Sequence, residues 1–189
     1  MSRWEPDARG RLAQAAMALY RERGYEQTTV AQIAERAGVT ERTFFRHFAD
    51  KREVLFDGSQ GLQRRMVAAV EAAPASASPL DALTAALAAA AELFLELPPE
   101  FPRQRQEVIA AHPALQEREL SKLARLSAAL GDALRRRGVA EPAASLTAEA
   151  GVAVFRVGFE RWISGAADRD LAVVLRESLA ELRALTARG

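Results

Sequence analysis

The chain has 189 residues, and its 26 Lys and Arg against 25 Asp and Glu leave a formal net charge of +1, so bulk charge indicates no nucleic-acid partner. It contains no cysteine, which excludes a disulfide framework, a thiolate metal site and a cysteine nucleophile. Alanine (41) and leucine (22) dominate the 49% of hydrophobic residues, a composition that favours helices over a large sheet.

Neither a targeting signal nor a membrane span is evident. The N-terminal segment carries acidic residues and no apolar run behind a basic cluster, unlike a secretory signal. The longest uncharged, mostly apolar stretch is 82–91, about half of the roughly 20 residues that a bilayer span requires. We expect a soluble protein located in the cytoplasm.

The N-terminal part of the chain predicts three short helices, over 7–24, 28–37 and 41–47. Apolar residues in the first keep a three-to-four spacing, and Gly24 follows where a helix C-cap glycine belongs. Gly38 supplies a tight turn between the second and third. Two short helices joined by a glycine-containing turn form a helix-turn-helix.

From Lys51 onward, longer apolar stripes predict further helices and no strand. Prolines and glycines separate them into segments 51–73, 79–97, 103–111, 113–137, 144–164 and 169–187. The expected fold is therefore all-α, with an N-terminal three-helix helix-turn-helix domain over 1–50, a larger C-terminal helical bundle over 51–189, and about nine helices in total.

The third helix has one apolar and one polar face. Phe44 and Phe48 are four residues apart, which places both on the side expected to face the core. The opposite surface suits the major groove of DNA, because arginine pairs with guanine, threonine reaches bases or phosphate, and an aromatic ring contacts a thymine methyl group or a sugar. This surface carries Arg42, Thr43, Phe45, Arg46 and His47.

The run 28–56 resembles the DNA-binding signature of the TetR family of bacterial one-component repressors. The agreeing positions are Thr28-Thr29, Ile33-Ala34, Ala37-Gly38-Val39, Thr43-Phe44-Phe45, His47-Phe48, and Lys51 before Glu53 and Leu55. With the first helix included, the resemblance covers about the first 56 residues.

The resemblance implies a set of DNA contacts. In the family, the positions that usually touch DNA match Thr29, Arg42, Thr43, Phe45, Arg46, His47 and Lys51. The position of Phe45 is commonly tyrosine, so a phosphate hydrogen bond through the hydroxyl is missing here. Phe45 can instead pack, and His47 can instead cap its helix.

The same resemblance implies that the C-terminal domain dimerises and holds an inducer. Segment 108–120 looks like a subgroup that takes acyl-CoA-like ligands. Arg103 and His112, together with Arg105, are candidates for an anionic head group, although a solvated face also explains them. The expected ligand-binding residues are Leu62, Met66, Phe94, Phe101, Arg105, Ile109, Leu126 and Phe155, each of which can also be plain core.

The last two predicted helices suit a two-fold dimer interface. Apolar residues from Val152 to Trp162 recur at three-to-four spacing, and two glycines on the same helix allow another helix to approach. The alternative is that this stripe serves the core of one chain, or that Trp162 lines the pocket. The expected interface residues are Gly151, Val154, Gly158, Trp162, Leu175 and Leu182.

These expectations define a sequence-specific transcriptional regulator: a homodimeric repressor released from a palindromic operator when a hydrophobic or acyl-CoA-like inducer pivots the helix that begins at Lys51. We expect no cofactor, no metal, no membrane partner and no enzymatic activity, because the chain has two histidines and neither a His-Glu metal motif nor a glycine-rich phosphate loop. A constitutive or architectural DNA-binding protein, an activator, and an all-helical enzyme with an incidental helix-turn-helix remain the alternatives.

Overall fold

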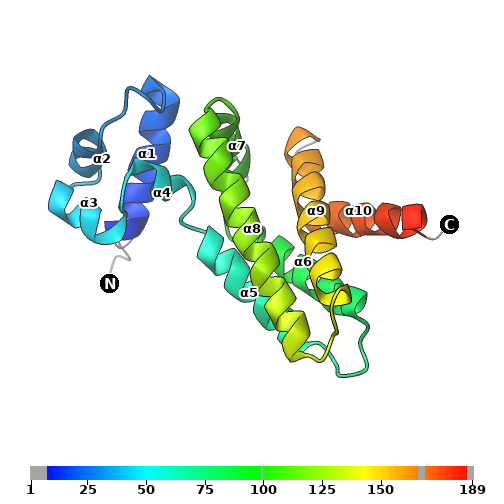
Figure 1. Cartoon of the computed structure of the whole chain (residues 1–189). Coiled ribbons are helices and arrows are strands. Elements are labelled where there is room, and N and C mark those ends of the chain that lie inside the picture. Colours follow the sequence, from blue (N-terminus) through cyan, green and yellow to red (C-terminus); the bar gives the residue numbers. More distant parts are fainter. Residues whose placement is uncertain (1–7, 99, 166–168, 187–189) are drawn as a thin grey trace, which may run out of the picture. The chain divides into compact units, whose positions relative to one another are not determined.

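A computed structural model describes residues 8–98, 100–165 and 169–186, and within these ranges it contains ten α-helices and no strand (Figure 1). The predicted all-α fold is thereby confirmed. The helices are α1 (Ala8–Arg23), α2 (Val30–Arg36), α3 (Glu41–His47), α4 (Lys51–Leu55), α5 (Ser59–Ala72), α6 (Pro79–Leu95), α7 (Phe101–Ala110), α8 (Pro113–Arg136), α9 (Ala143–Ser164) and α10 (Leu171–Thr186).

The tenth helix arises because the stretch expected as one helix over 51–73 is two. The first ends at Leu55, the second begins at Ser59, and a turn separates them. Phe56 leaves helical geometry, with φ −108° and ψ 12°, and its side chain is buried. Asp57 forms an ion pair with Arg9 on α1, so the turn is fixed to the N-terminal helices. The helix proposed from sequence to pivot as one piece is therefore interrupted.

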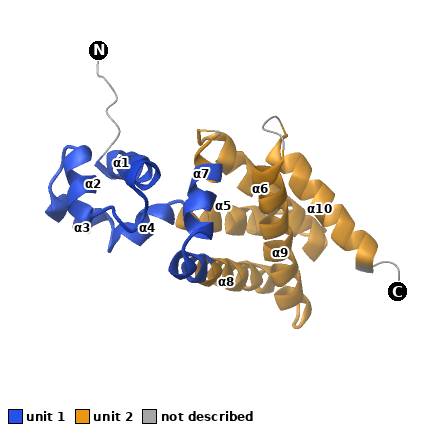
Figure 2. Ribbon diagram, turned by 90° about the horizontal axis from the view of Figure 1, so that it is seen from above, with its two compact units in different colours: residues 1–58, 103–119 blue, residues 59–102, 120–189 orange. Residues whose placement is uncertain are grey.

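The chain forms two compact units (Figure 2). Unit 1 comprises Met1–Gly58 and Arg103–Glu119, and unit 2 comprises Ser59–Pro102 and Leu120–Gly189. This division differs from the predicted 1–50 and 51–189, because α4, most of α7 and the first turns of α8 belong with the helix-turn-helix. Helix α8 thus contributes residues to both units.

The core of unit 1 forms where α1 packs against α2, α3 and α4. Leu12, Ile33 and Phe44 are fully buried there. Burying one side chain of this size contributes about 1.5–3 kcal/mol, so these residues fix the angle between α2 and α3. The outward face of α3 is thus held on a packed base.

The core of unit 2 is organised around α6, which packs against α5, α9 and α10. The alanines expected from composition concentrate here: Ala82, Ala86 and Ala90 form a fully buried stripe on α6. Because an alanine side chain is one methyl group, neighbouring helices approach closely without a large side chain between them.

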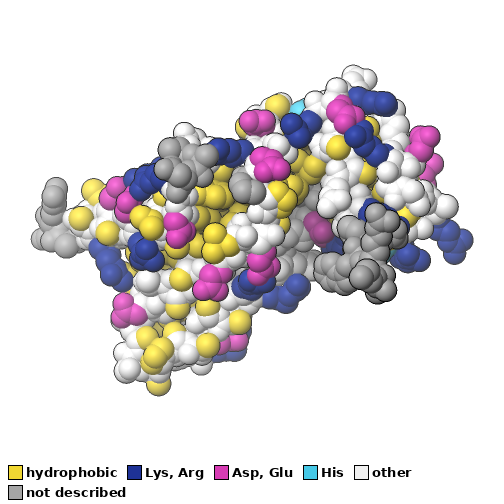
Figure 3. Space-filling model, turned by 180° about the vertical axis from the view of Figure 1, so that it is seen from behind, with side chains coloured by type: hydrophobic (Ala, Val, Ile, Leu, Met, Phe, Trp, Pro, Cys, Tyr) yellow, Lys and Arg dark blue, Asp and Glu magenta, His cyan; other side chains and the backbone are white. Residues whose placement is uncertain are grey.

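The surface is not uniformly polar. On the face shown in Figure 3, hydrophobic side chains form an area bordered by Lys, Arg, Asp and Glu. Among the described residues, the exposed large apolar side chains are Phe45, Leu95, Leu120, Leu146, Val157 and Leu185. Among the helices described, none combines the length and apolar character needed to cross a bilayer.

Candidate DNA-binding surface and regulatory unit

The helix-turn-helix is positioned by local capping. The Thr29 hydroxyl accepts a hydrogen bond from the backbone N–H of Gln32, whose side chain accepts one from the N–H of Thr29, a reciprocal capping box. Gly38 adopts φ +67° in the turn, a left-handed conformation that costs a residue with a Cβ more than it costs glycine. Thr40 then caps α3 by accepting from the N–H of Thr43.

Helix α3 presents two opposite faces, as its sequence predicts. Phe44 and Phe48 are 0% and 3% exposed, whereas Phe45 is 56% exposed. Arg42 and Arg46 are also exposed, and in the described structure neither has an ion-pair or hydrogen-bond partner. Together with Thr43, these three outward residues line a shallow hollow of about 460 Å³. The outward face therefore offers two unpaired guanidinium groups and an aromatic ring.

Three other predicted contact residues already have local roles. Thr29 is exposed, and its hydroxyl oxygen is engaged in the cap described above, which leaves its O–H free to donate. The Thr43 hydroxyl lies 3.1 Å from that of Thr40. The Nε2 atom of His47 is buried and has no hydrogen-bond partner, so it does not face solvent in this conformation.

Lys51 is directed inward rather than toward solvent. Its ammonium group donates to the carbonyls of Tyr25 (2.8 Å), Thr28 (2.9 Å) and Glu26 (3.3 Å) and lies 4.4 Å from the centre of the Tyr25 ring. A lysine has three N–H donors, so all are engaged. The structure therefore places Lys51 as a support for the turn before α2, with no donor left for a phosphate.

A network of aromatic side chains surrounds this support. The Tyr20 hydroxyl donates to the carbonyl of Lys51 at 2.7 Å, and burial raises the pKa of Tyr20. Burial also raises the pKa of Tyr25 to about 12, against an opposing effect of Arg52. The Tyr25 ring lies 5.0 Å from that of His112, whose Nδ1 donates to the carbonyl of Val108. Both tyrosines therefore stay protonated at neutral pH.

No local pattern in the sequence predicts that segment 103–119 belongs to the same compact unit as the DNA-binding helices. Arg105 donates to the carbonyl of Leu55 at 2.6 Å, pairs with Glu119 at 3.0 Å and lies over the Phe56 ring. Burial lowers the pKa of Arg105, and Glu119 opposes that effect. Arg118 pairs with Glu53 of α4 at 2.7 Å. The contacts of Arg105 and Arg118 with α4 join residues 50 and 65 positions apart, which no local pattern can reveal.

The predicted ligand-binding residues divide between the two units. Arg105 and Ile109 lie in unit 1, where Arg105 is engaged as described and Ile109 is fully buried. Phe101 lies in unit 2 at the start of α7 and is half-buried. The remaining five gather in or against the core of unit 2: Leu62, Met66, Phe94, Leu126 and Phe155. Arg105 lies apart from these five, and intramolecular partners engage its guanidinium group.

Most of the predicted dimer residues lie inside unit 2. A Cβ atom on Gly158 would meet Leu175 Cδ2 at 2.6 Å, and one on Gly151 would overlap Leu83 of α6. The two glycines thus allow close packing of α9 on α10 and α6 of the same chain. Val154 and Leu175 are buried as well, at 5% and 1% exposure. These four assignments need correction, since their surfaces are covered within one chain.

The other two predicted interface residues, Trp162 and Leu182, are half-buried and pack against the same core. Trp162 lies 6.1 Å from the ring of Phe94 and donates from its indole nitrogen to the carbonyl of Arg169 at 2.8 Å. The apolar stripe of α9 that includes Phe155 and Phe159 belongs to this aromatic cluster. Trp162 and Leu182 therefore fit the alternative interpretation of the sequence, in which the apolar stripe of α9 belongs to the core of one chain.

A helix-turn-helix on a packed base, joined to a larger helical unit, defines the class of DNA-binding regulators with a separate sensory domain. Two family models match the chain: one described as bacterial regulatory proteins, tetR family, over residues 12–57, and one described as MftR C-terminal domain, over residues 77–187. The chain belongs to the TetR family. It is a transcriptional regulator with a helix-turn-helix DNA-binding domain and a C-terminal domain that matches the MftR C-terminal domain.

Individual relatives agree with this placement. The chain is 44% identical to the HTH-type transcriptional regulator TcmR of Streptomyces glaucescens over 81 residues, which are 43% of this chain and 36% of TcmR. The chain thus matches about a third of that relative's length. TetR-family regulators are generally transcription factors rather than enzymes.

Solved structures share the fold. FadR of Thermus thermophilus, a TetR-family repressor in complex with lauroyl-CoA, is 28% identical, with 92% of each chain covered and a TM-score of 0.57. The SmeT–triclosan complex, from the repressor of a Stenotrophomonas maltophilia multidrug efflux pump, is 22% identical, with 92% of this chain and 90% of that chain covered and a TM-score of 0.61.

Proposed function

We propose that this regulator is a repressor in the cytoplasm that binds a palindromic operator as a homodimer and is released by a hydrophobic or acyl-CoA-like ligand. The observation that carries the DNA-binding part is the outward face of α3, where Arg42 and Arg46 are unpaired while the opposite face is buried. Two other arginines close to this surface in the sequence are paired with carboxylates, Arg36 with Glu22 and Arg52 with Asp50.

The residues of this surface have different proposed roles. Arg42 and Arg46 read guanine or bind phosphate, and the exposed Phe45 ring contacts a thymine methyl group or a sugar. Thr29 donates its hydroxyl proton to phosphate while its oxygen caps α2, and Thr43 offers a second hydroxyl on the outward side of α3. His47 reaches DNA only if its ring rotates, because its Nε2 is buried in the free protein. Lys51 acts by positioning α2.

Removing the Arg42 guanidinium tests this contact map. A bidentate arginine–guanine pair contributes about 1–3 kcal/mol, so Arg42→Ala should weaken operator binding by roughly tenfold or more. Fluorescence anisotropy with the DNA upstream of the protein's own gene measures the affinity. Arg36→Ala is the matched control, since its guanidinium is paired with Glu22, 2.7 Å from Nη2, and should leave the affinity nearly unchanged. Equal affinities for Arg42→Ala and wild type would refute the proposed reading face.

The proposed homodimer uses a surface of α9 that the core leaves uncovered. Leu146 and Val157 are 65% and 43% exposed, and Ala150 and Ala153 lie between them at spacings of four, three and four residues. Such spacing places all four on one side of the helix. On α10, Leu185 is 76% exposed. An outward apolar stripe separate from the core suits a two-fold contact with a second copy.

Light scattering coupled to size-exclusion chromatography tests the dimer. Wild type should elute as a dimer, and Val157→Glu should shift it toward monomer because a carboxylate would be buried against an apolar stripe. Leu120→Glu changes an apolar residue of α8 that is more exposed than Val157, 61% against 43%, and should stay dimeric. A dimeric Val157→Glu protein would place the interface elsewhere, and a monomeric wild type would refute the dimer.

The proposed ligand response rests on the core of unit 2 and on the likeness to FadR, whose structure holds lauroyl-CoA. The candidate residues for an apolar tail are those around Met66, Phe94 and Phe155. Helices α4 and α5 are separate, whereas α8 is one helix with residues in both units. Its first turns include Arg118, which pairs with Glu53 of α4. A ligand that favours one arrangement of unit 2 would alter operator binding through α8.

The response is tested by measuring operator affinity with and without lauroyl-CoA, laurate and triclosan. A repressor of the proposed kind loses affinity with at least one of these ligands. Unchanged affinity with all three, while ligand binding is seen by calorimetry, would indicate a constitutive DNA-binding protein. Increased expression from the promoter when the protein is bound would indicate an activator instead.

A further inference from the structure

Phe45 is the one exposed large apolar side chain in the described part of unit 1, and the other five of this kind lie in unit 2. Phe44 and Phe48 on the same helix are buried, whereas 56% of Phe45 is exposed. The core of the DNA-binding helices does not use this ring, so its role depends on the outward face of α3.

The ring of Phe45 is held in place by its neighbour. Its centre lies 5.5 Å from that of the Phe44 ring, and the two planes are 84° apart, a T-shaped arrangement that aromatic pairs favour. Phe44 is fully buried and fixed by the core. Phe45 therefore presents a positioned apolar surface.

Two cations accompany this ring. Arg42 and Arg46 are exposed, and neither has an ion-pair or hydrogen-bond partner among the described residues. Both line the hollow of about 460 Å³ to which Phe45 and Thr43 also contribute. Along the helix axis, Phe45 lies between the two arginines. Guanidinium groups bound to guanine or phosphate would therefore bring the ring into the major groove.

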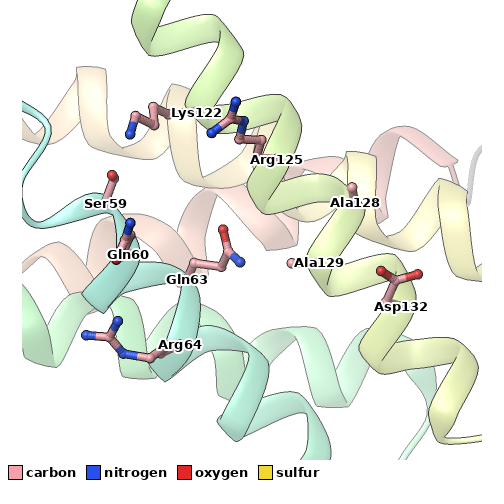
Figure 4. A pocket seen from close by; sticks show the side chains of 9 residues that line it. All are labelled: Ser59, Gln60, Gln63, Arg64, Lys122, Arg125, Ala128, Ala129 and Asp132. Atoms are coloured by element: carbon pink, nitrogen blue, oxygen red, sulfur yellow. The ribbon is translucent and has the colours of Figure 1, made fainter. Parts of the chain in front are cut away.

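The larger hollow of unit 2, between α5 and α8, has a different lining (Figure 4). Amide, hydroxyl and charged groups line it together with the methyl groups of Ala128 and Ala129, and none of its nine lining residues is aromatic. Of these two hollows, only the one on α3 combines an aromatic ring with arginine side chains.

The floor of the major groove offers such a ring one apolar partner. Every base pair presents hydrogen-bonding groups there, and only thymine adds a methyl group, at C5. A phenyl ring has no donor or acceptor, so it matches the methyl group and none of the polar groups. Helix α3 has seven residues and is about 10 Å long, less than the roughly 12 Å width of the groove, so both of its turns can reach base edges.

We propose that Phe45 reads the C5-methyl group of a pyrimidine in each operator half-site, so that binding depends on whether this methyl group is present. Thymine carries it, uracil and cytosine lack it, and 5-methylcytosine carries it at the same position. Cytosine methylation within a half-site therefore changes the affinity of the regulator for DNA. The inference rests on the proposed function and specifies what the operator presents to α3.

The test begins with an operator that the full-length protein selects from a library of random duplexes. Fluorescence anisotropy then compares this operator made with thymine and made with uracil. Burial of one methyl-sized group corresponds to about fourfold in affinity, so the wild type should bind the uracil operator about fourfold more weakly for each half-site. Equal affinities, or selected half-sites that share no thymine, would overturn the inference.

Matched variants assign the effect to Phe45. Phe45→Ala should bind the thymine operator more weakly and lose the preference for thymine over uracil, whereas Phe45→Tyr keeps the ring and should keep the preference. Arg46→Ala, on the same face, should weaken binding to both operators and keep the preference. Circular dichroism checks that each variant is folded. An undiminished preference in Phe45→Ala would overturn the proposal, and equally weakened binding to both operators would indicate that the ring contacts a sugar instead.

Single replacements then locate the methyl group. The thymine whose change to uracil reproduces the loss is replaced by cytosine and by 5-methylcytosine, and the methylated operator should bind about fourfold more tightly than the unmethylated one. Equal affinity of these two operators would refute the response to methylation. Failure to select any operator would refute the proposed function itself, whereas an operator bound equally well with thymine and with uracil would refute only the role of Phe45.

Discussion

At the residue scale, Lys51 of unit 1 shows how an expectation from sequence can differ from the structure. The sequence pattern suggests that its side chain is exposed, whereas in the structure the side chain is directed inward. A lysine at the start of a helix beside a recognition helix suggests a phosphate contact. Its ammonium group instead satisfies carbonyls of the turn that precedes α2. Because that turn precedes α2, we expect Lys51 to act on the position of the DNA-reading helices rather than through a phosphate contact.

Replacing Lys51 separates positioning from direct contact. Lys51→Met removes the donors to partly buried carbonyls, and we expect a loss of about 1–3 kcal/mol in the free energy of unfolding. Operator affinity should fall, but the slope of log affinity against log salt should stay the same, since no phosphate contact is lost. Urea unfolding and salt-dependent anisotropy measure the two effects. A slope reduced by about one per binding site would show that Lys51 contacts a phosphate.

Asp50 makes the start of α4 sensitive to pH. Burial raises its pKa, but hydrogen bonds from the Arg52 side chain and from the backbone N–H groups of Glu53 and Arg52 hold the pKa below its usual value. A lowered folded-state pKa means that this stabilisation is present above the unfolded-state pKa and is lost as pH falls through the folded-state value.

Asp50→Asn keeps a good N-cap residue and removes the titration. The Tm of the wild type should exceed that of Asp50→Asn near pH 6, and the difference should shrink toward about pH 3 as the carboxylate is protonated. Thermal melts of both proteins across this range measure the difference in Tm. The contributions of the other carboxylates largely cancel in this difference, because both proteins contain them. A difference independent of pH would show that the charge of Asp50 does not stabilise α4.

At the scale of elements, the glycines of α9 decide how closely the last helices pack. Gly158 lies where a Cβ would meet Leu175 Cδ2 at 2.6 Å and Ser178 Oγ at 3.3 Å. Leu175 is 1% exposed and Ser178 is also buried, so neither can move away freely. The glycine spacing that suggests a dimer contact in the sequence therefore serves contacts within one chain.

Gly158→Ala should destabilise unit 2 by about 1–3 kcal/mol through overpacking. Gly131→Ala on α8 is the control, because its Cβ would meet no atom closer than 3.5 Å and alanine favours helix. We expect Gly131→Ala to be neutral or slightly stabilising in urea unfolding. Equal stabilities of the two variants would mean that α9 and α10 separate easily enough to accept a methyl group.

The helices themselves were largely predictable, and their partners were not. The bounds of α3 agree with prediction because Thr40 and Phe48 are local signals, a cap and an apolar residue one turn after Phe44. The break after Leu55 differs from the predicted single helix; Phe56 and Asp57 there contact Arg105 and Arg9, which are distant in sequence. The sequence likewise cannot distinguish an apolar stripe that faces a second copy from one that faces α6 or α10.

At the scale of the whole molecule, the charge count of the sequence differs from the number of charges that the structure leaves unpaired. Residues 36–52 hold five basic and two acidic side chains, which suggests a patch of +3. In the structure, Arg36 and Arg52 are paired with carboxylates and Lys51 with carbonyls. The cations left on this segment are Arg42 and Arg46, so the field that DNA meets comes from fewer groups than the sequence count implies.

The salt dependence of operator binding measures this difference. Each phosphate neutralised on duplex DNA contributes about −0.9 to the slope of log affinity against log salt. Arg46→Ala should reduce the magnitude of the slope by roughly one for each protomer bound if Arg46 meets a phosphate, whereas Arg36→Ala should not change it. Anisotropy titrations at several salt concentrations give the slopes. Equal changes for the two variants would show that pairing with Glu22 does not withhold Arg36 from DNA.

Unit 1 is assembled from two stretches of chain, Met1–Gly58 and Arg103–Glu119, and this limits how the protein can be recombined. A hybrid regulator cut after the helix-turn-helix would combine one protein's α4 with another's partners for Glu53, Leu55 and Phe56. In this protein Glu53 pairs with Arg118, while the Leu55 carbonyl and the Phe56 ring contact Arg105. We therefore expect that an exchange of DNA specificity between relatives has to carry both stretches together.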